Sequence, residues 1–125
     1  MKKTIVFLFV LFVLSITAVA QAHSVVLTWS PSTDGAANAS SGYNVLRGTT
    51  SGGESSTPIN SAAVAVGCTN TTTCTYTDTS SAVVAGATLY YEVTFVVGTT
   101  SSAPSNQASG TVPVAAPTGL TATAN

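Results

Sequence analysis

Residues 89–97 read Leu-Tyr-Tyr-Glu-Val-Thr-Phe-Val-Val, and this stretch decides the fold class. Large apolar side chains alternate with more polar ones over most of its length, and a period of two predicts a β-strand with one face in the core. We expect the inward face to hold Leu89, Tyr91, Val93 and Phe95. We expect the outward face to hold Tyr90, Glu92 and Thr94.

Shorter runs on both sides of this stretch show the same alternation, with Gly, Ser, Asn and Pro between them. No segment after residue 23 has helical periodicity with capping residues. Several short alternating strands separated by turn residues are the signature of an all-β sandwich. The further predicted strands cover residues 24–30, 42–47, 62–66, 74–79 and 107–112.

The N-terminus has the features of a signal peptide. Lys2 and Lys3 precede an almost unbroken apolar run over residues 5–16, and small residues follow near a cleavage site after Ala22 or Ala20. The run is short for a transmembrane helix, so an uncleaved anchor is the weaker alternative. We therefore expect a signal peptide over 1–22 and a secreted protein, extracellular or at the cell surface, without membrane attachment after cleavage.

Export determines how the two cysteines are interpreted. Cys68 and Cys74 are separated by five residues, and a close pair outside the cytoplasm favours a disulfide that locks a hairpin tip. A metal site would need further soft ligands, and His23 is the only histidine. Asn38 and Asn70 match the acceptor pattern for N-glycosylation, so covalent glycans are candidate partners.

The charge balance excludes several classes of function. Without the two N-terminal lysines, Arg47 is the only Lys or Arg beside four acidic residues, and such a surface does not suit nucleic acid. The acids are scattered over separate segments, so no carboxylate pair or nucleophile–base pair is expected. We interpret them, and Arg47, as solvated surface or turn residues, and we expect no enzyme, cofactor or metal site. The acids are Asp34, Glu54, Asp78 and Glu92.

Several segments together resemble a fibronectin type III domain, an immunoglobulin-like β-sandwich. Residues 25–31 (Val-Val-Leu-Thr-Trp-Ser-Pro) and 41–48 (Ser-Gly-Tyr-Asn-Val-Leu-Arg-Gly) resemble its strands B and C. Residues 85–94 resemble the approach to strand F, and residues 102–112 resemble strand G. The resemblance implies a seven-strand sandwich. The sequence departs from the family at Leu89, where a corner tyrosine is common, so a neighbouring tyrosine would have to supply that hydrogen bond.

The first strand of the family stands at the wrong end of this chain. Only two residues separate the predicted cleavage site from strand B, which leaves no room for strand A. Residues 116–125, Ala-Pro-Thr-Gly-Leu-Thr-Ala-Thr-Ala-Asn, resemble strand A, with Leu120, Ala122 and Ala124 on one face. We therefore expect a domain over 23–112 that lacks strand A, a linker over 113–117 and a donor strand over 118–125.

Three arrangements fit this displaced strand: the chain begins a longer tandem array, the tail folds back, or the tail enters a neighbouring copy. Folding back must cross a strand length of roughly 20–25 Å, which takes about seven extended residues, and the linker prolines resist the reversal. We favour insertion beside Val25, Leu27 and Trp29 of a neighbour, giving a homopolymeric extracellular filament. The alternative is a monomeric adhesion or carbohydrate-associated module.

Overall fold

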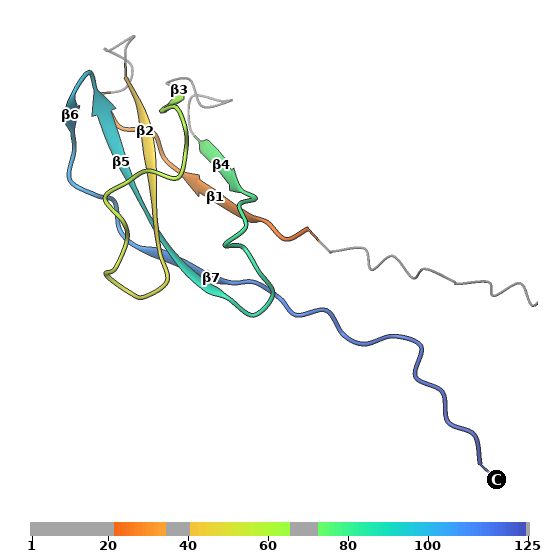
Figure 1. The fold of residues 1–125 in the computed structure, drawn as a ribbon. Helices are drawn as coiled ribbons and strands as arrows, with labels where there is room; N and C mark the ends of the chain where they lie inside the picture. Colours follow the sequence, from red (N-terminus) through yellow and green to blue (C-terminus); the bar gives the residue numbers. More distant parts are fainter. Residues whose placement is uncertain (1–21, 35–40, 66–72, 125) are drawn as a thin grey trace, which may run out of the picture.

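The computed structural model describes residues 22–34, 41–65 and 73–124, and no helix occurs among them. The protein is all-β, with two antiparallel sheets in two layers (Figure 1). One sheet contains β1 (Val25–Trp29) and β4 (Cys74–Asp78). The other sheet contains β3 (Val64–Ala65), β2 (Ser41–Gly48), β5 (Thr88–Val97), β6 (Thr100–Ser101) and β7 (Ala108–Thr111).

The strand pairing centres on β5, as its long alternating sequence suggests. β2 pairs with it from Ser41 opposite Val97 to Gly48 opposite Tyr90. On its other edge, β7 pairs with the first half of β5 and β6 with its last two residues. In the smaller sheet β1 pairs with β4 over five residues. All six predicted strands are therefore present, although β3 covers only part of the predicted range 62–66.

β6 was not predicted, because residues 98–105 have the composition of a turn. Gly98 adopts a positive φ of 59° and reverses the chain tightly enough for Thr100 and Ser101 to pair with the end of β5. The next segment stays beside β5 through both the main-chain and side-chain groups of Ser102 and Ser105. The Ser102 N–H donates to Phe95 O, and the Ser102 hydroxyl accepts a hydrogen bond from the Phe95 N–H. Ser105 makes the same pair of hydrogen bonds with the main chain of Val93.

The inward face of β5 forms the core, as predicted. Leu89 and Tyr91 are 1% and 2% exposed, and they pack with Val45, Val83 and Val112. A second cluster joins Tyr43, Cys74 and Phe95. The expectation that Thr94 is an outward surface residue was wrong. It is buried, because β5 is an inner strand with β2 on one side and residues 102–105 on the other.

Asp78 and Arg47 also correct the sequence analysis, which placed both on the solvated surface. Asp78 is 1% exposed at the end of β4, and Arg47 Nη1 on β2 lies 2.6 Å from its Oδ2 atom. The Tyr91 hydroxyl donates to the same oxygen at 3.0 Å, and the Ser80 N–H donates to Oδ1 at 3.0 Å. The carboxylate is buried because three elements supply its hydrogen-bond donors.

This network shifts the acid–base equilibria of two of its members. Burial alone would raise the pKa of Asp78, but hydrogen bonds from Ser80, Arg47 and Tyr91 outweigh it and hold that pKa below its ordinary value. Burial, with the hydrogen bond to Asp78, raises the pKa of Tyr91 far above its ordinary value. At neutral pH the cluster therefore holds an ionised carboxylate and a neutral phenol that ties β5 to β4.

Asn60 completes the edge of β2 where β3 is too short to pair with it. Its Oδ1 accepts the Val45 N–H at 2.7 Å, and its Nδ2 donates to Tyr43 O at 2.9 Å and to Ala62 O at 2.8 Å. Replacing Asn60 by Ala removes all three hydrogen bonds and leaves the Val45 N–H unpaired. We expect Asn60→Ala to lower the free energy of unfolding by about 1–3 kcal/mol, measured by urea denaturation.

Asn44 offers a matched control for this measurement. It lies half-buried on the same strand, and among the described residues its side chain makes no hydrogen bond. Asn44→Ala should change the unfolding free energy much less than Asn60→Ala. Equal effects of the two substitutions would contradict the role assigned to the Asn60 side chain.

Candidate functional site: the groove beside β1

β1 has a strand partner on one side only. Within the described residues it pairs with β4, and no strand lies along its other edge. Exposure alternates along the strand, with Val25, Leu27 and Trp29 half-buried and Val26 and Thr28 exposed. The three residues predicted to form an acceptor face therefore do point to the core, but the core does not cover them completely.

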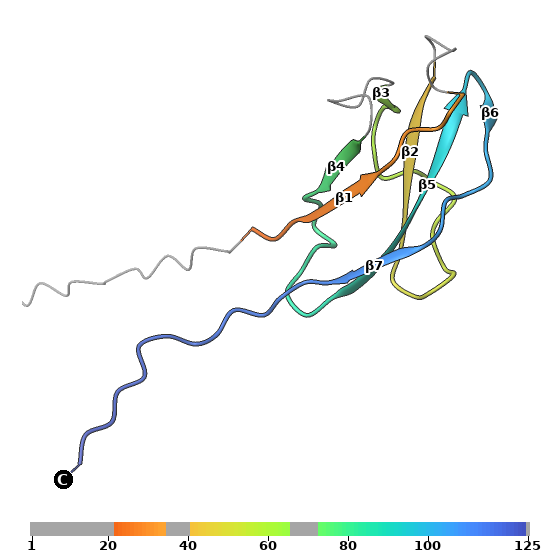
Figure 2. The same ribbon diagram turned by 180° about the vertical axis from the view of Figure 1, so that it is seen from behind.

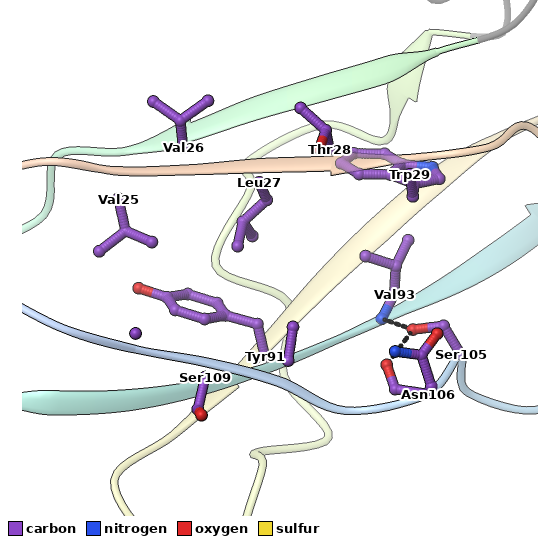
Figure 3. Close-up of a pocket in the computed structure, with 12 residues that line it drawn as sticks. Val25, Val26, Leu27, Thr28, Trp29, Tyr91, Val93, Ser105, Asn106 and Ser109 are labelled. Atoms are coloured by element: carbon purple, nitrogen blue, oxygen red, sulfur yellow. Dashed lines mark hydrogen bonds between the residues drawn. The ribbon is translucent and has the colours of Figure 1, made fainter.

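A groove of about 340 Å³ runs along this open edge, between β1 and the chain segment that contains β7. Figure 3 shows the side chains of Val25 and Leu27 directed into it, with the ring of Tyr91 on its floor. The opposite wall consists of polar or very small residues, so no large apolar side chain on that wall packs against the apolar face of β1. These wall residues are Ser105, Asn106, Ala108, Ser109 and Gly110.

β1 and β7 run in opposite directions along the two sides of the groove. Val25 lies towards the Ser109 end and Trp29 towards Ser105 and Asn106 (Figure 3). A Cβ atom placed on Gly110 would come within 4.0 Å of Val25 Cγ1, so the end of β7 lies close to the start of β1. The chain that follows β7 therefore leaves the domain at the Val25 end of the groove.

Trp29 lies at the other end of the groove and joins it to the second core cluster. Its ring packs edge-on against Tyr43, with centroids 5.5 Å apart, and Tyr43 packs in turn against Phe95. The buried Nε1–H of Trp29 has no hydrogen-bond acceptor within the described part of the chain. A buried donor left without an acceptor costs about 1–3 kcal/mol, so the Trp29 Nε1–H is the polar group of β1 that would gain most from an added acceptor.

The C-terminal tail makes no comparable packing. Residues 113–124 are all exposed and form no regular secondary structure, and Leu120 is 98% exposed. Figures 1 and 2 show the tail running away from the sandwich beside the start of β1. The predicted donor residues Leu120, Ala122 and Ala124 therefore lie in solvent, and within this single chain they contact neither their own groove nor the core.

The predicted disulfide and glycan sites fall largely outside the described residues. Cys74 is fully buried and no free cysteine is found among the described residues, but Cys68 lies outside them, so the bridge between the two stays a prediction. Asn38 and Asn70 also lie outside the described residues, as does the predicted signal peptide except for Ala22.

The acidic residues do not converge on a reaction centre. Asp34 is exposed in a turn, and Glu54 accepts a 2.6 Å hydrogen bond from Gln107 Nε2. Glu92 lies on β5, and Asp78 belongs to the buried network with Arg47. No cluster of three potential metal ligands occurs within residues 22–34, 41–65 and 73–124, and no helix there could span a membrane.

The fold and the groove define an all-β protein of two antiparallel sheets in which the edge strand β1 turns an apolar face to an open groove. No family model, curated protein or solved structure matches this chain. The functional interpretation therefore depends on the geometry of the groove and the tail.

Proposed function

We propose that the chain is a secreted fibronectin type III-like subunit that polymerises into an extracellular filament. Each domain accepts, beside β1, the C-terminal strand of a neighbouring copy, so the partner is the chain itself. The proposal rests on one observation: the same molecule contains both an open groove and an exposed strand-like tail. A groove with an apolar face on β1 lies along an open strand edge, and a tail with alternating apolar residues projects into solvent.

The groove and the tail complement each other chemically. An inserted strand would pair with the unpaired main-chain groups of β1 and cover the half-buried faces of Val25, Leu27 and Trp29. The tail in turn buries Leu120, which contributes about 2 kcal/mol, with the main-chain hydrogen bonds adding to this. The groove lies beside β1 and the donor tail extends from the end of β7. The contact is thus head-to-tail and propagates unless the subunits close into a ring.

Negative-stain electron microscopy of the exported chain, beginning at His23, tests the proposal. We expect filaments from the full-length chain and only monomers from a chain that ends at Val114. Truncation removes residues that pack on nothing in the described structure, so the domain should remain folded. A length-matched control carries Ser in place of Leu120, Ala122 and Ala124 and should also remain monomeric.

Trp29 reports on the same event in solution, because it is the only tryptophan of the chain and lines the groove. A peptide of residues 116–125 added to the truncated chain should shift the Trp29 emission to shorter wavelength as the groove loses water. Filaments that persist after truncation would overturn the proposal. Monomers in both samples would leave the monomeric binding module as the better interpretation.

A further inference from the structure

We infer that the end of the domain from which the tail departs is a second contact between neighbouring copies, made by Val84 and Val114. This inference rests on the proposed function and extends it, because it adds a direct contact between the domains to the strand that joins them. The partner at this surface is a second copy of the chain, and the contact is apolar.

Val84 and Val114 both flank Gly86, in the turn that precedes β5. The Gly86 N–H donates to Val112 O and the Val112 N–H donates to Ala87 O, both at 2.9 Å, so the chain after β7 is fixed beside this turn. A Cβ atom placed on Gly86 would lie 3.6 Å from Val114 Cγ2. Figures 1 and 2 show the same turn beside the departing tail.

These two valines are the exposed apolar residues that strand exchange alone does not use. Within the described residues four large apolar side chains are exposed, and two of them already belong to the proposed exchange. Leu120 is the anchor of the tail, and Val26 lies on β1 beside the groove. Val84 and Val114, 53% and 73% exposed, would remain in water at the end of the sandwich from which the tail leaves.

The segments that contain the two valines are free of charge. Neither residues 79–87 nor residues 111–119 include Asp, Glu, Lys, Arg or His. The central parts of protein–protein contacts are likewise poor in charged residues. An uncharged apolar surface therefore fits another uncharged protein surface better than a nucleic acid or an anionic membrane, which both require cations.

The short linker brings a neighbouring copy onto this surface. Val114 lies beside Gly86, so only residues 115–117 separate it from the donor segment 118–125. Three extended residues span about 10 Å, which is also about the distance between two packed sheets. A copy whose groove holds the donor segment is therefore placed against Val84 and Val114. Because the linker keeps the two surfaces together, even a small apolar contact adds to the affinity.

The test compares the tail attached to its domain with the tail alone. Full-length chains use both surfaces, whereas a peptide of residues 116–125 reaches only the groove of a chain that ends at Val114. Val84→Asp places a carboxylate in the inferred contact. Thr75→Asp is the matched control, because it adds the same charge at an exposed position on β4, opposite Thr28 and away from the tail.

We expect Val84→Asp and Val114→Asp each to raise the concentration for half-assembly of the full-length chain at least about 10-fold, since a carboxylate would lose water in the contact. Thr75→Asp should assemble as the native chain does. Binding of the peptide to the truncated chain, followed by Trp29 emission, should be the same with and without Val84→Asp. Val114→Asp repeats the assembly test outside the strands, at a side chain that is 73% exposed, in case Val84→Asp lowers the unfolding free energy.

Native assembly by both valine variants, with normal peptide binding, would overturn the second contact and leave strand exchange intact. Weaker peptide binding to a folded Val84→Asp chain would also overturn it, because Val84 would then act through the groove. Absence of both filaments and peptide binding in the native protein would overturn the inference together with the proposed function.

Discussion

Replacing Asp78 by Ala is expected to lower the free energy of unfolding by about 3–5 kcal/mol, a large part of the stability of a domain this small. The carboxylate is 1% exposed and accepts hydrogen bonds from Arg47, Tyr91 and the Ser80 N–H. Without it, the Arg47 guanidinium loses its ion-pair partner at a site where only 19% of its side chain is exposed. The Tyr91 hydroxyl also loses its acceptor in the core.

The same network predicts how stability depends on pH. Because the folded protein holds the pKa of Asp78 below its ordinary value of about 4, the carboxylate stabilises the fold fully at pH values above that ordinary value. The contribution falls as the pH drops through the ordinary value and is lost below the pKa of the folded state. Urea denaturation between pH 7 and pH 2 should therefore show a decline in native stability that Asp78→Ala largely removes.

Glu92→Ala is the matched control, since Glu92 lies half-buried on β5 with no ion-pair partner among the described residues. It should change the unfolding free energy by less than about 1 kcal/mol. Tyr91→Phe tests the network from its other side, because it keeps the ring and removes only the hydroxyl. If Asp78→Ala were no more harmful than Glu92→Ala, the buried network would have no role in stability.

The sheet-forming segments could be predicted from the sequence because apolar and polar side chains alternate along them, and in a strand this alternation follows the buried and exposed faces. Residues 89–97 show this best, since Leu89, Tyr91 and Phe95 are buried as their spacing indicates. The short strands were harder to predict. β6 forms because the positive φ of Gly98 allows a tight reversal, and composition alone does not distinguish such a hairpin from an open turn.

Asp78 shows the limit of reasoning from residue type. An acid at a strand end is usually solvated, and nothing near Asp78 in the sequence identifies Arg47 or Tyr91 as its partners. Those partners are 31 and 13 residues away, and only the pairing of the strands brings them together. The Tyr91 hydroxyl donates to the Asp78 carboxylate at the end of β4, a contact that only the packing of the two sheets creates.

The candidate site was predictable in its residues but not in its shape. Alternation alone placed Val25, Leu27 and Trp29 on one face, and the structure shows that face half-buried beside an open edge. The other side of the groove comes from Tyr91 and Val93 on β5 and from residues 105–110. No pattern within β1 identifies these residues as its neighbours, because only the packing of the two sheets brings them there.

Stability and assembly should be separable from the side of the tail, because residues 113–124 are exposed throughout. The Asp78 network is different, since Tyr91, which donates to Asp78, also lines the groove. Asp78→Ala is therefore expected to weaken filaments through the groove as well as by unfolding subunits. Substitutions in the tail should abolish filaments without changing the unfolding free energy of the monomer.

Leu120→Asp is expected to abolish filament formation at every practical concentration, while the monomer keeps its native unfolding free energy. Leu120 is 98% exposed in the free chain, so the substitution removes nothing from the folded domain. In the assembled groove the new carboxylate would be buried beside the apolar face of β1 without a cationic partner, since Arg47 is already paired with Asp78. The milder Leu120→Ala loses about 2 kcal/mol of burial and should raise the concentration for half-assembly roughly 30-fold.

Thr121→Asp provides the control, because it adds the same charge to the neighbouring position on the opposite face of the tail. Side chains alternate along an extended strand, so Thr121 points away from the groove when Leu120 points into it. It should therefore assemble nearly as the native chain does at moderate salt, as judged by sedimentation and by electron microscopy. If both aspartates blocked assembly equally, the tail would act through its net charge alone, and a strand seated in the groove by Leu120 would no longer explain polymerisation.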